Sequence, residues 1–406
     1  MLLDMKLINF GQINMGQFIH YGEDPIVVVT DFECMRDTFV KTGESYTGRH
    51  LMTAINNVLT GLTEGNRWRT MRRFTLKAMR DLGMGKKPLT KQIEQSENGS
   101  IIKQIDQMID ILAGSTINQM LFETLEKQRL TITTIRGRLL MGMPWLRYFP
   151  LFNSTFKEFD LQVTSTYKFF ESNIFERIKK RKNKKEEEEE SKDLINYFLN
   201  KMDEIKKENN NNNNDLNEFN IENLRSLCYD LFLAGQETIC ITLNFLILYL
   251  LIDQRVQFKL QKELDEFKEK FKIENLDEKH FRSVNRFELP YTNAVINETQ
   301  RLCNLLPLNL SHKTTNNVEL LNGKIKLPAG TAIVPQISCA LYDEKIFPEP
   351  NNFIPERFIS SNGSLKKIDQ FIPFINPFHP PNTEKQLGFG VFPYPFSCRI
   401  ELRRRD

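Results

Sequence analysis

One long amphipathic window constrains the fold more than any other feature of this chain. Residues 222 to 254, ENLRSLCYDLFLAGQETICITLNFLILYLLIDQ, carry apolar residues three and four positions apart, which is the period of an α-helix. Similar windows fill most of the chain between about residues 50 and 310, including RVQFKLQKELDEFKEKF. The most apolar part, residues 241 to 252, carries Asn244 and is too short to span a hydrocarbon core of about 30 Å, so we expect a buried helix.

Short sheet signals flank this helical region. DPIVVVT, residues 24 to 30, is a β-branched run of strand length, and a helical segment with Asp31 at its N-cap follows it. In VELLNGKIKLPAGT, Asn322-Gly323 separates two strand-like runs and predicts a hairpin. Frequent prolines beyond Pro335 predict an irregular but packed region. The expected fold class is mainly α (α+β), with a small β-sheet region.

The composition excludes several classes of protein. The 406 residues include 55 Lys and Arg against 52 Asp and Glu, and a net charge of +3 argues against a nucleic-acid partner. The six cysteines are scattered without a Cys-x-x-Cys pair, which argues against a disulfide framework and a structural zinc site. Asp4 and Lys6 interrupt the apolar N-terminus, so we expect neither a signal peptide nor a membrane-spanning segment.

Two low-complexity stretches interrupt the helical region, KKRKNKKEEEEESKD at residues 179 to 193 and NNNNNN at residues 209 to 214. Because both lie between helical windows, we interpret them as solvated loop expansions and not as domain boundaries. We therefore expect residues 1 to 406 to form a single domain.

Two charges lie within an apolar helical segment, NAVINETQRLCNLLP. Glu298 and Arg301 are three residues apart, so they share a helical face and can pair. In FPEPNNFIPERF, Arg357 lies in a proline-bounded turn from which its guanidinium could complete a Glu-Arg-Arg cluster. Such a cluster fixes geometry more than it adds stability, so the expected role is structural. The alternative for this spacing is a chance pair on a helix surface.

A basic helix is predicted in GNRWRTMRRFTL. Trp68 and Arg72 are four residues apart and share a face, where an indole N–H and a guanidinium could together hold a carboxylate of a cofactor. The alternative is a basic amphipathic helix that packs against a core or a partner.

Small and polar residues interrupt the most apolar helix in LFLAGQET. Glycine in a helix interior costs about 1 kcal/mol relative to alanine, so Ala234 and Gly235 indicate a close approach by another group. With Glu237 and Thr238 beside them, the groove could hold a flat ligand next to a proton path. The alternative is the crossing point of a second helix.

Taken in this order, the four stretches resemble the motifs of the cytochrome P450 family of haem-thiolate monooxygenases, over residues from about 20 to 390. AGQET is similar to the family's distal oxygen-binding segment, ETQR to its ExxR helix, FIPERF to its PERF turn and NRWRTMRR to its WxxxR helix. The resemblance implies a mostly helical triangular prism with a small sheet region. It also implies haem b as the cofactor, an NAD(P)H-dependent reductase as the electron donor and a small hydrophobic organic substrate.

The resemblance also implies a role for each site residue. Trp68, Arg72 and His312 would hold the haem propionates, the last from the stretch NLSHKT, and the Glu-Arg-Arg cluster would be the family's core cluster. Ala234 and Gly235 would lie over the haem face. The residues expected to relay protons to the oxygen at the haem are Glu237 and Thr238.

The last segment, LGFGVFPYPFSCRIELRRRD, departs from the family's cysteine loop, which reads approximately FGxGxRxCxG. LGFGV matches its first half, but Phe392 then stands at the position of the propionate-binding Arg and Tyr394 at that of the cysteine. Cys398 is an out-of-register candidate, four residues late, and Pro393 and Pro395 provide no N–H groups to stabilise a thiolate. We therefore predict a haem site without its proper axial metal ligand.

These features predict a monooxygenase by descent that is inactive as written because the axial cysteine loop is disrupted. The abrupt change of sequence fits a shifted reading frame or an incorrect splice junction, and the chain is expected to lack parts of the family's domain at both ends. The alternative function is that of a non-catalytic remnant, or a pseudogene product, that binds a hydrophobic ligand or a protein. Family members are often anchored to the endoplasmic reticulum membrane, and the sequence leaves the location of this chain open.

Overall fold

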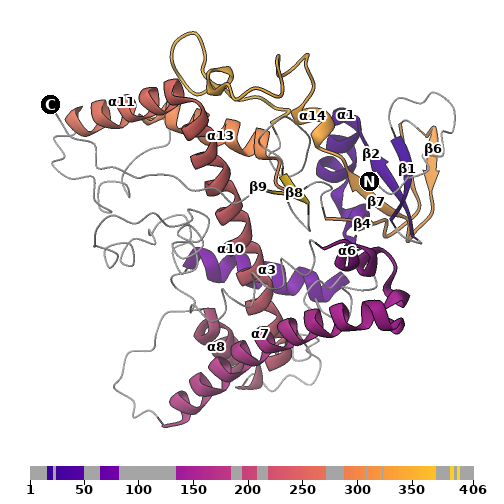
Figure 1. The fold of residues 1–406 in the computed structure, drawn as a ribbon. Coiled ribbons are helices and arrows are strands. Elements are labelled where there is room, and N and C mark those ends of the chain that lie inside the picture. The colour runs from indigo at the N-terminus through magenta and orange to yellow at the C-terminus, as the bar shows by residue number, and fades with distance from the viewer. Residues whose placement is uncertain are drawn as a thin grey trace. The chain divides into compact units, whose positions relative to one another are not determined.

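The computed structural model describes residues 16–21, 24–49, 65–81, 134–183, 194–207, 218–270, 288–306, 310–321, 323–371, 385–387 and 391–393. Of these residues 67% are helical, which confirms the mainly α prediction (Figure 1). The chain divides into two compact units, and each is described by itself. Among the described residues, those up to Tyr46 and from Gln236 onward form the first unit, and those from Thr47 to Gly235 form the second.

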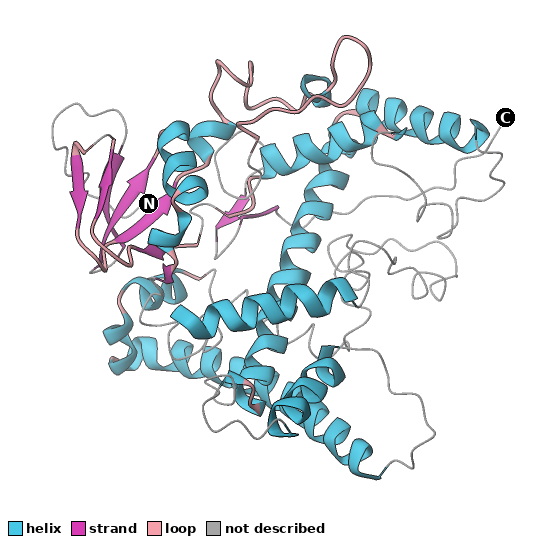
Figure 2. Ribbon diagram, turned by 180° about the vertical axis from the view of Figure 1, so that it is seen from behind, coloured by secondary structure: helices cyan, strands magenta, loops and turns pink. Residues whose placement is uncertain are grey.

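A small sheet begins the first unit (Figure 2). The strand predicted at residues 24 to 30 is confirmed as β2 (Asp24–Val29), which pairs antiparallel with β1 (Gly16–Tyr21) and parallel with β7 (Ala332–Pro335). On its other side β7 pairs antiparallel with β4 (His312–Lys313). Alternate β2 residues pack into two different apolar clusters because they point to opposite faces of the sheet. This burial on both faces explains the uninterrupted β-branched run.

The helix predicted after Asp31 is confirmed, with a wider second half. The Asp31 carboxylate accepts a hydrogen bond from the Cys34 N–H at 2.8 Å and so caps α1 (Phe32–Met35). The helix then widens into the π-helical η1 (Arg36–Lys41), and the 3-10 helix η2 (Gly43–Tyr46) follows. Together with β2 and β7, these elements enclose the core that contains Cys34, Met35 and Tyr46.

The predicted Asn-Gly hairpin is confirmed. β5 (Val318–Leu320) pairs antiparallel with β6 (Ile325–Leu327), so that the connection runs from residue 321 to residue 324. Gly323 has a φ of 83°, a left-handed conformation that glycine adopts without steric cost. The proline-rich region beyond is irregular and packed, as expected, and it contains α14 (Ser338–Leu341) and η6 (Pro355–Phe358).

The long apolar window forms α10 (Ile221–Ile252), whose residues from Gln236 onward belong to the first unit. Asp253 alone separates it from α11 (Gln254–Lys270), and the Asp253 carboxylate accepts hydrogen bonds from the N–H groups of Arg255 and Val256 at 3.0 and 3.3 Å. The two helices meet at 108°. No single helix of the described residues is long and apolar enough to cross a membrane. Taken together, the two bent helices have the length and the apolar composition of such a span, and no other property of them indicates one.

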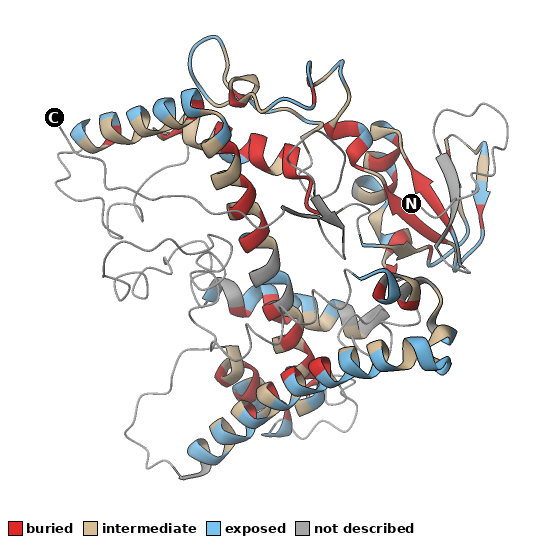
Figure 3. Ribbon diagram, in the orientation of Figure 1, coloured by how far each residue is buried: buried red, intermediate tan, exposed pale blue. Residues whose placement is uncertain are grey.

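One face of the C-terminal part of α10 is buried, which confirms the prediction for that face, whereas the other residues of this part are half-buried or, at Ile252, exposed (Figure 3). Phe245 and Tyr249 pack against Leu302 and Cys303 at the end of α13 (Pro290–Cys303) and against Leu305 just beyond it. This contact places α13 within the core of the first unit.

The second unit is helical. Its core joins Phe74 and Ala78 of α3 (Gly65–Asp81) to Ile174 of α7 (Pro150–Asn183), Phe198 of α8 (Leu194–Lys207) and Leu224 of α10. The low-complexity stretch at 179 to 193 begins as helix and lies outside the described residues from 184 onward, as does the stretch at 209 to 214. The other elements of this unit are β3 (Gly48–Arg49), α6 (Ile135–Gly142) and η4 (Pro144–Tyr148).

Candidate functional site

The start of α13 is fixed by a carboxylate from another helix. Glu263 of α11 accepts hydrogen bonds from the N–H groups of Tyr291 and Thr292 at 2.7 and 2.6 Å, and from the Thr292 hydroxyl at 2.6 Å. The first N–H groups of a helix have no partner within the helix, and its N-terminus favours negative charge. Glu263 therefore holds α13 in place relative to α11.

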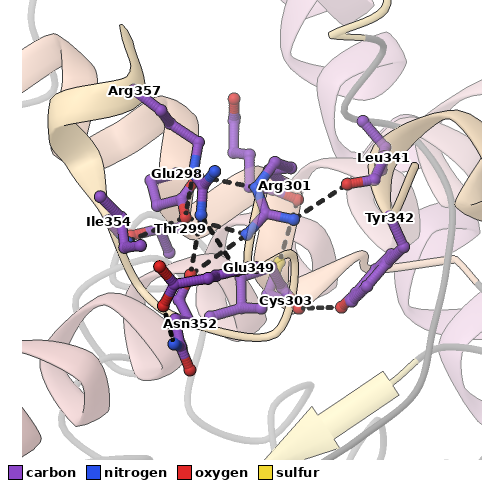
Figure 4. Close-up of polar contacts among 12 residues, drawn as sticks. Glu298, Thr299, Arg301, Cys303, Leu341, Tyr342, Glu349, Asn352, Ile354 and Arg357 are labelled. Atoms are coloured by element: carbon purple, nitrogen blue, oxygen red, sulfur yellow. Dashed lines mark hydrogen bonds and ion pairs between the residues drawn. The ribbon is translucent and has the colours of Figure 1, made fainter. Parts of the chain in front are cut away.

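The predicted pair Glu298 and Arg301 is confirmed in the C-terminal half of α13 (Figure 4). The Nε and Nη2 atoms of Arg301 donate to Oε2 and Oε1 of Glu298 at 2.7 and 2.9 Å. Both side chains are fully buried. The Nη1 atom of Arg301 donates to the Leu341 carbonyl at 2.9 Å, so the pair also holds the end of α14.

Arg357 of η6 completes the predicted cluster. Its Nε atom donates to Glu298 Oε1 at 3.0 Å, and Oε1 also accepts a hydrogen bond from the Ile354 N–H at 3.0 Å. The Nη atoms of Arg357 donate to the carbonyls of Pro348 and Glu349 at 2.7 and 3.2 Å. Burial lowers the pKa of Arg357, and the Glu298 carboxylate opposes that shift. The cluster thus orients the whole proline-bounded turn, which is the structural role expected.

A second carboxylate holds the same turn and is not predicted by the sequence. Oε1 of Glu356 accepts hydrogen bonds from Arg255 and Lys259 of α11, each at 2.7 Å, and from the Tyr291 hydroxyl at 3.1 Å. The two cations outweigh partial burial and lower the pKa of Glu356. The partners of Glu356 lie 65 to 101 positions away in the sequence, so local patterns could not predict its contacts. Its place next to Arg357 was the one sequence feature that could have drawn attention to it.

His312 lies at the start of β4 in the first unit. Its Nδ1 atom is 2.8 Å from the carbonyl oxygen of Tyr46, and its ring lies 5.5 Å from that of Phe39. In the sheet it pairs with Ile333 of β7. The ring is half-buried and its orientation is set by a backbone carbonyl.

The small residues of α10 are exposed, although the helix is apolar around them. Ala234 and Gly235 are exposed, and no atom of the described residues would lie within 4 Å of a Cβ added at Gly235. No described helix therefore crosses closely at this glycine. Thr238 is half-buried, and its carbonyl accepts a hydrogen bond from the Thr242 hydroxyl at 2.8 Å. The side chain of Glu237 lies outside the described residues.

Asp230 is a further acidic residue of α10 that the sequence analysis did not single out. Burial raises the pKa of its carboxyl from an ordinary value of 3.8 to about 7. Asp230 is four residues from Ala234, so the signal that could have found it was a lone acid in the apolar run CYDLFLAG.

The predicted anion clamp lies on α3 in the second unit. Arg72 is exposed, and the side chain of Trp68 lies outside the described residues. On the opposite face Phe74 and Ala78 are buried in the core, so the amphipathic packing proposed as the alternative is confirmed. It does not conflict with a clamp, because the basic residues remain at the surface.

The cysteine-loop segment is described only in part. β8 (Lys385–Leu387) and β9 (Val391–Pro393) pair antiparallel, with Phe392 opposite Gln386. Tyr394 and Cys398 lie outside the described residues. Within the described part of the chain, no group of three or more His, Cys, Asp or Glu residues could hold a metal ion.

The structure thus brings together one predicted set, Glu298, Arg301 and Arg357. The other predicted residues belong to different units, so their convergence on one ligand stays a prediction. Those of the second unit are Trp68, Arg72, Ala234 and Gly235, and those of the first are Glu237, Thr238 and His312.

Comparison with known proteins gives one consistent result. The family model described as cytochrome P450 matches residues 18–375. Cytochrome P450 2C41 of Canis lupus familiaris is 31% identical over 389 residues, which cover 88% of this chain and 74% of that protein. Cytochrome P450 2C29 of Mus musculus is 29% identical over 396 residues, which cover 92% of this chain and 77% of that protein. Cytochrome P450 2C8 of Homo sapiens is 29% identical over 390 residues, which cover 90% of this chain and 76% of that protein.

Proposed function

This chain belongs to the cytochrome P450 family, and from that premise we propose that it binds haem but, with the cysteine loop as written, does not insert oxygen into a substrate. The family is one of haem-dependent monooxygenases, so haem is the cofactor. By the same proposal, the substrate class is small hydrophobic organic compounds, and the electron donor is an NAD(P)H-dependent reductase.

The observation that carries this proposal is the Glu298, Arg301 and Arg357 cluster. It links α13, the end of α14 and η6 through hydrogen bonds between residues up to about 59 positions apart. A chance Glu-x-x-Arg pair on a helix surface would have neither the burial nor the second guanidinium. By this proposal, the buried cluster corresponds to the core cluster of the family.

By this proposal, several described residues have, each taken by itself, properties that suit contact with haem. Ala234 and Gly235 offer an exposed, small-residue surface that a porphyrin face can approach. Arg72 of α3 is exposed, as a residue that binds a propionate must be, and His312 is held in a fixed orientation by the Tyr46 carbonyl. Trp68 would add its indole N–H to the same carboxylates.

Haem with a thiolate ligand supplies the electron donation that cleaves dioxygen in this family. The part of this chain in that reaction would be to move protons. Thr238 and Glu237 follow Gly235 on α10, so they would deliver protons beside the porphyrin face. The apolar residues of α10 around them would exclude bulk water from the substrate.

The residues at the expected position of the thiolate ligand do not suit that role. In the register set by LGFGV, Tyr394 replaces the cysteine and Phe392 replaces the propionate-binding arginine. Pro393 and Pro395 remove N–H groups that would stabilise a thiolate, so Cys398 has no prepared position under the metal. By this proposal oxygen insertion is lost, whereas binding of haem and of a hydrophobic ligand would not depend on the cysteine loop. A binding role for a hydrophobic ligand is the second candidate function, and the exposed surface at Ala234 and Gly235 favours it.

The reduced carbon-monoxide difference spectrum of the protein expressed with haem tests this function. The expected result is a haem Soret band without the red shift typical of thiolate ligation. A thiolate-type shift would contradict the proposal, and the Cys398→Ser variant would then show whether Cys398 is its source. Absence of any haem band would contradict haem binding and leave the ligand-binding role.

A further inference from the structure

An exposed turn just after η6 carries an asparagine followed by a glycine. The Ser360 N–H donates to the Ser364 carbonyl at 2.9 Å and closes the turn, and Asn362 and Gly363 lie exposed at its tip. Gly363 has a φ of 80°, and beyond its chain neighbours no atom of the described residues would lie within 4 Å of a Cβ added there. The backbone nitrogen of Gly363 is therefore not shielded by a side chain, and water can reach it.

Hydrogen-bond donors gather at the side-chain carbonyl of Asn362. The N–H and the hydroxyl of Ser364 donate to its Oδ1 atom at 3.1 and 2.7 Å. The Ser360 hydroxyl is also within reach of Oδ1, but its single hydrogen is shared with the carbonyl and hydroxyl oxygens of Ser364. Donors at a carbonyl oxygen stabilise the negative charge that develops there when a nucleophile attacks the carbon. The turn therefore activates the Asn362 amide.

We propose that Asn362 is a site of spontaneous deamidation and that Ser364 accelerates the reaction. The Gly363 nitrogen loses its proton to hydroxide and forms a bond to Cγ of Asn362, which lies within the same short segment of chain. The bond from Cγ to Nδ2 then breaks, and the leaving nitrogen takes up a proton from water and departs as ammonia. Water opens the resulting cyclic succinimide at either carbonyl, which leaves aspartate or isoaspartate at this position. Nothing is oxidised or reduced, and one water is consumed.

One hydrogen bond opposes this reaction. The Gly363 N–H donates to the Ser360 carbonyl at 2.9 Å and must be released before the nitrogen attacks. A neutral hydrogen bond of this kind slows the attack by roughly tenfold at most. In a buried active site the loss of one oxyanion donor costs about 100- to 1000-fold, and at an exposed turn competition from water reduces that effect. We therefore expect the Ser364 hydroxyl alone to contribute roughly three- to tenfold.

The two products would affect the turn differently. Aspartate would accept the same hydrogen bonds from Ser364 with a full negative charge, which strengthens them. Isoaspartate adds one methylene to the main chain between Ser360 and Ser364, so it would disturb the antiparallel bridge between Ile359 and Leu365. Deamidation would thus either preserve this turn or loosen it, according to which carbonyl of the succinimide is hydrolysed.

The test follows the amide of Asn362 in the purified full chain during incubation at mildly alkaline pH. Trypsin releases residues 358 to 366, a peptide in which Asn362 is the only asparagine, and mass spectrometry detects the exchange of its amide nitrogen for oxygen. Ser364→Ala should slow the reaction by roughly three- to tenfold in the folded protein and should have no effect in concentrated urea. Ser364→Thr keeps the hydroxyl and should keep the rate. Ser361→Ala, at an exposed neighbour, is the matched control and should also keep it.

Each outcome decides the proposal. Slowing by Ser364→Ala only in the folded protein, with the rate kept by Ser364→Thr, supports it. An unchanged or faster rate in folded Ser364→Ala overturns the role of Ser364, as does equal slowing in urea, which would assign the effect to local sequence. If Asn362 stays intact in the folded protein while it converts in urea, the turn protects the amide and the proposal is wrong. Far-UV circular dichroism before incubation shows that each variant is folded.

Discussion

The carboxylate of Glu298 accepts two hydrogen bonds from the guanidinium of Arg301, at 2.7 and 2.9 Å, and neither side chain is exposed to solvent. On a helix surface, the same spacing would contribute about 0.2–0.5 kcal/mol. Here Glu298 also accepts hydrogen bonds from Arg357 and from the Ile354 N–H. Removing the carboxylate charge would leave two buried guanidinium groups without their counter-ion.

Glu298→Gln should therefore lower the free energy of unfolding by about 3–5 kcal/mol, because breaking a buried ion pair leaves an uncompensated charge. Urea unfolding followed by circular dichroism measures this loss. Glu319→Gln is the matched control, since Glu319 is exposed and pairs with Lys326, also exposed, across the β5–β6 hairpin. It should change stability by less than about 0.5 kcal/mol. Equal effects of the two substitutions would contradict a structural role for the cluster.

Glu263→Gln should destabilise the first unit by about 1–2 kcal/mol, the scale of a lost helix cap. Its carboxylate accepts three hydrogen bonds from the first turn of α13, and an amide can replace only part of them. Glu266→Gln on the same helix is the control, because Glu266 is exposed and its ion pair with Lys262 is long, at 3.7 Å. Thermal unfolding compares the two, and a loss in Glu266→Gln as large as in Glu263→Gln would rule out capping.

Asp230→Asn should stabilise the protein increasingly as the pH rises. Folding raises the pKa of Asp230 from 3.8 to about 7, so the folded state binds more protons and ionisation destabilises it between these two values. At about 1.4 kcal/mol per pKa unit, the gain should be near zero at about pH 4 and a few kcal/mol at about pH 8. Urea midpoints at both values measure it. A gain that does not change with pH would contradict burial as the cause.

In a background that also carries Pro393→Ala and Pro395→Ala, which return the missing N–H groups, Phe392→Arg combined with Tyr394→Cys should restore thiolate ligation. The pair places an arginine and a cysteine at the positions that the family uses, in the register set by LGFGV. The reduced carbon-monoxide complex of the double variant should show the thiolate-type Soret shift, and Phe392→Arg with Tyr394→Ser should not. If both spectra remain alike, the two substituted positions do not explain the loss of the axial ligand.

The features that could be predicted from the sequence depend on local chemistry. The 3.6-residue period of the 222 to 254 window gave α10, the β-branched run gave β2, and Asn322-Gly323 gave the β5–β6 hairpin. The Glu298 and Arg301 pair follows from their spacing on one helix. In each case the residues that decide the structure lie within a few positions of one another.

The features that could not be predicted depend on contacts distant in the sequence. Glu263 caps a helix that begins about 27 residues later, and nothing in its own window distinguishes it from Glu266. The 108° bend at Asp253 separates two windows of the same period, so periodicity alone does not reveal it. The raised pKa of Asp230 could not be predicted either, because it depends on burial and an acid in an apolar run can also face solvent.

Glu356 and Arg357 are neighbours in the chain and serve opposite sides of one turn. Glu356 binds Arg255 and Lys259, whereas Arg357 binds Glu298. An insertion of one residue before Glu356 would bring Glu356 to the side of Glu298, and a deletion there would bring Arg357 to the side of Arg255 and Lys259. Either change would replace attraction by repulsion on one side of the turn. The length of this turn is therefore much less free to vary in evolution than the composition of the loops around it.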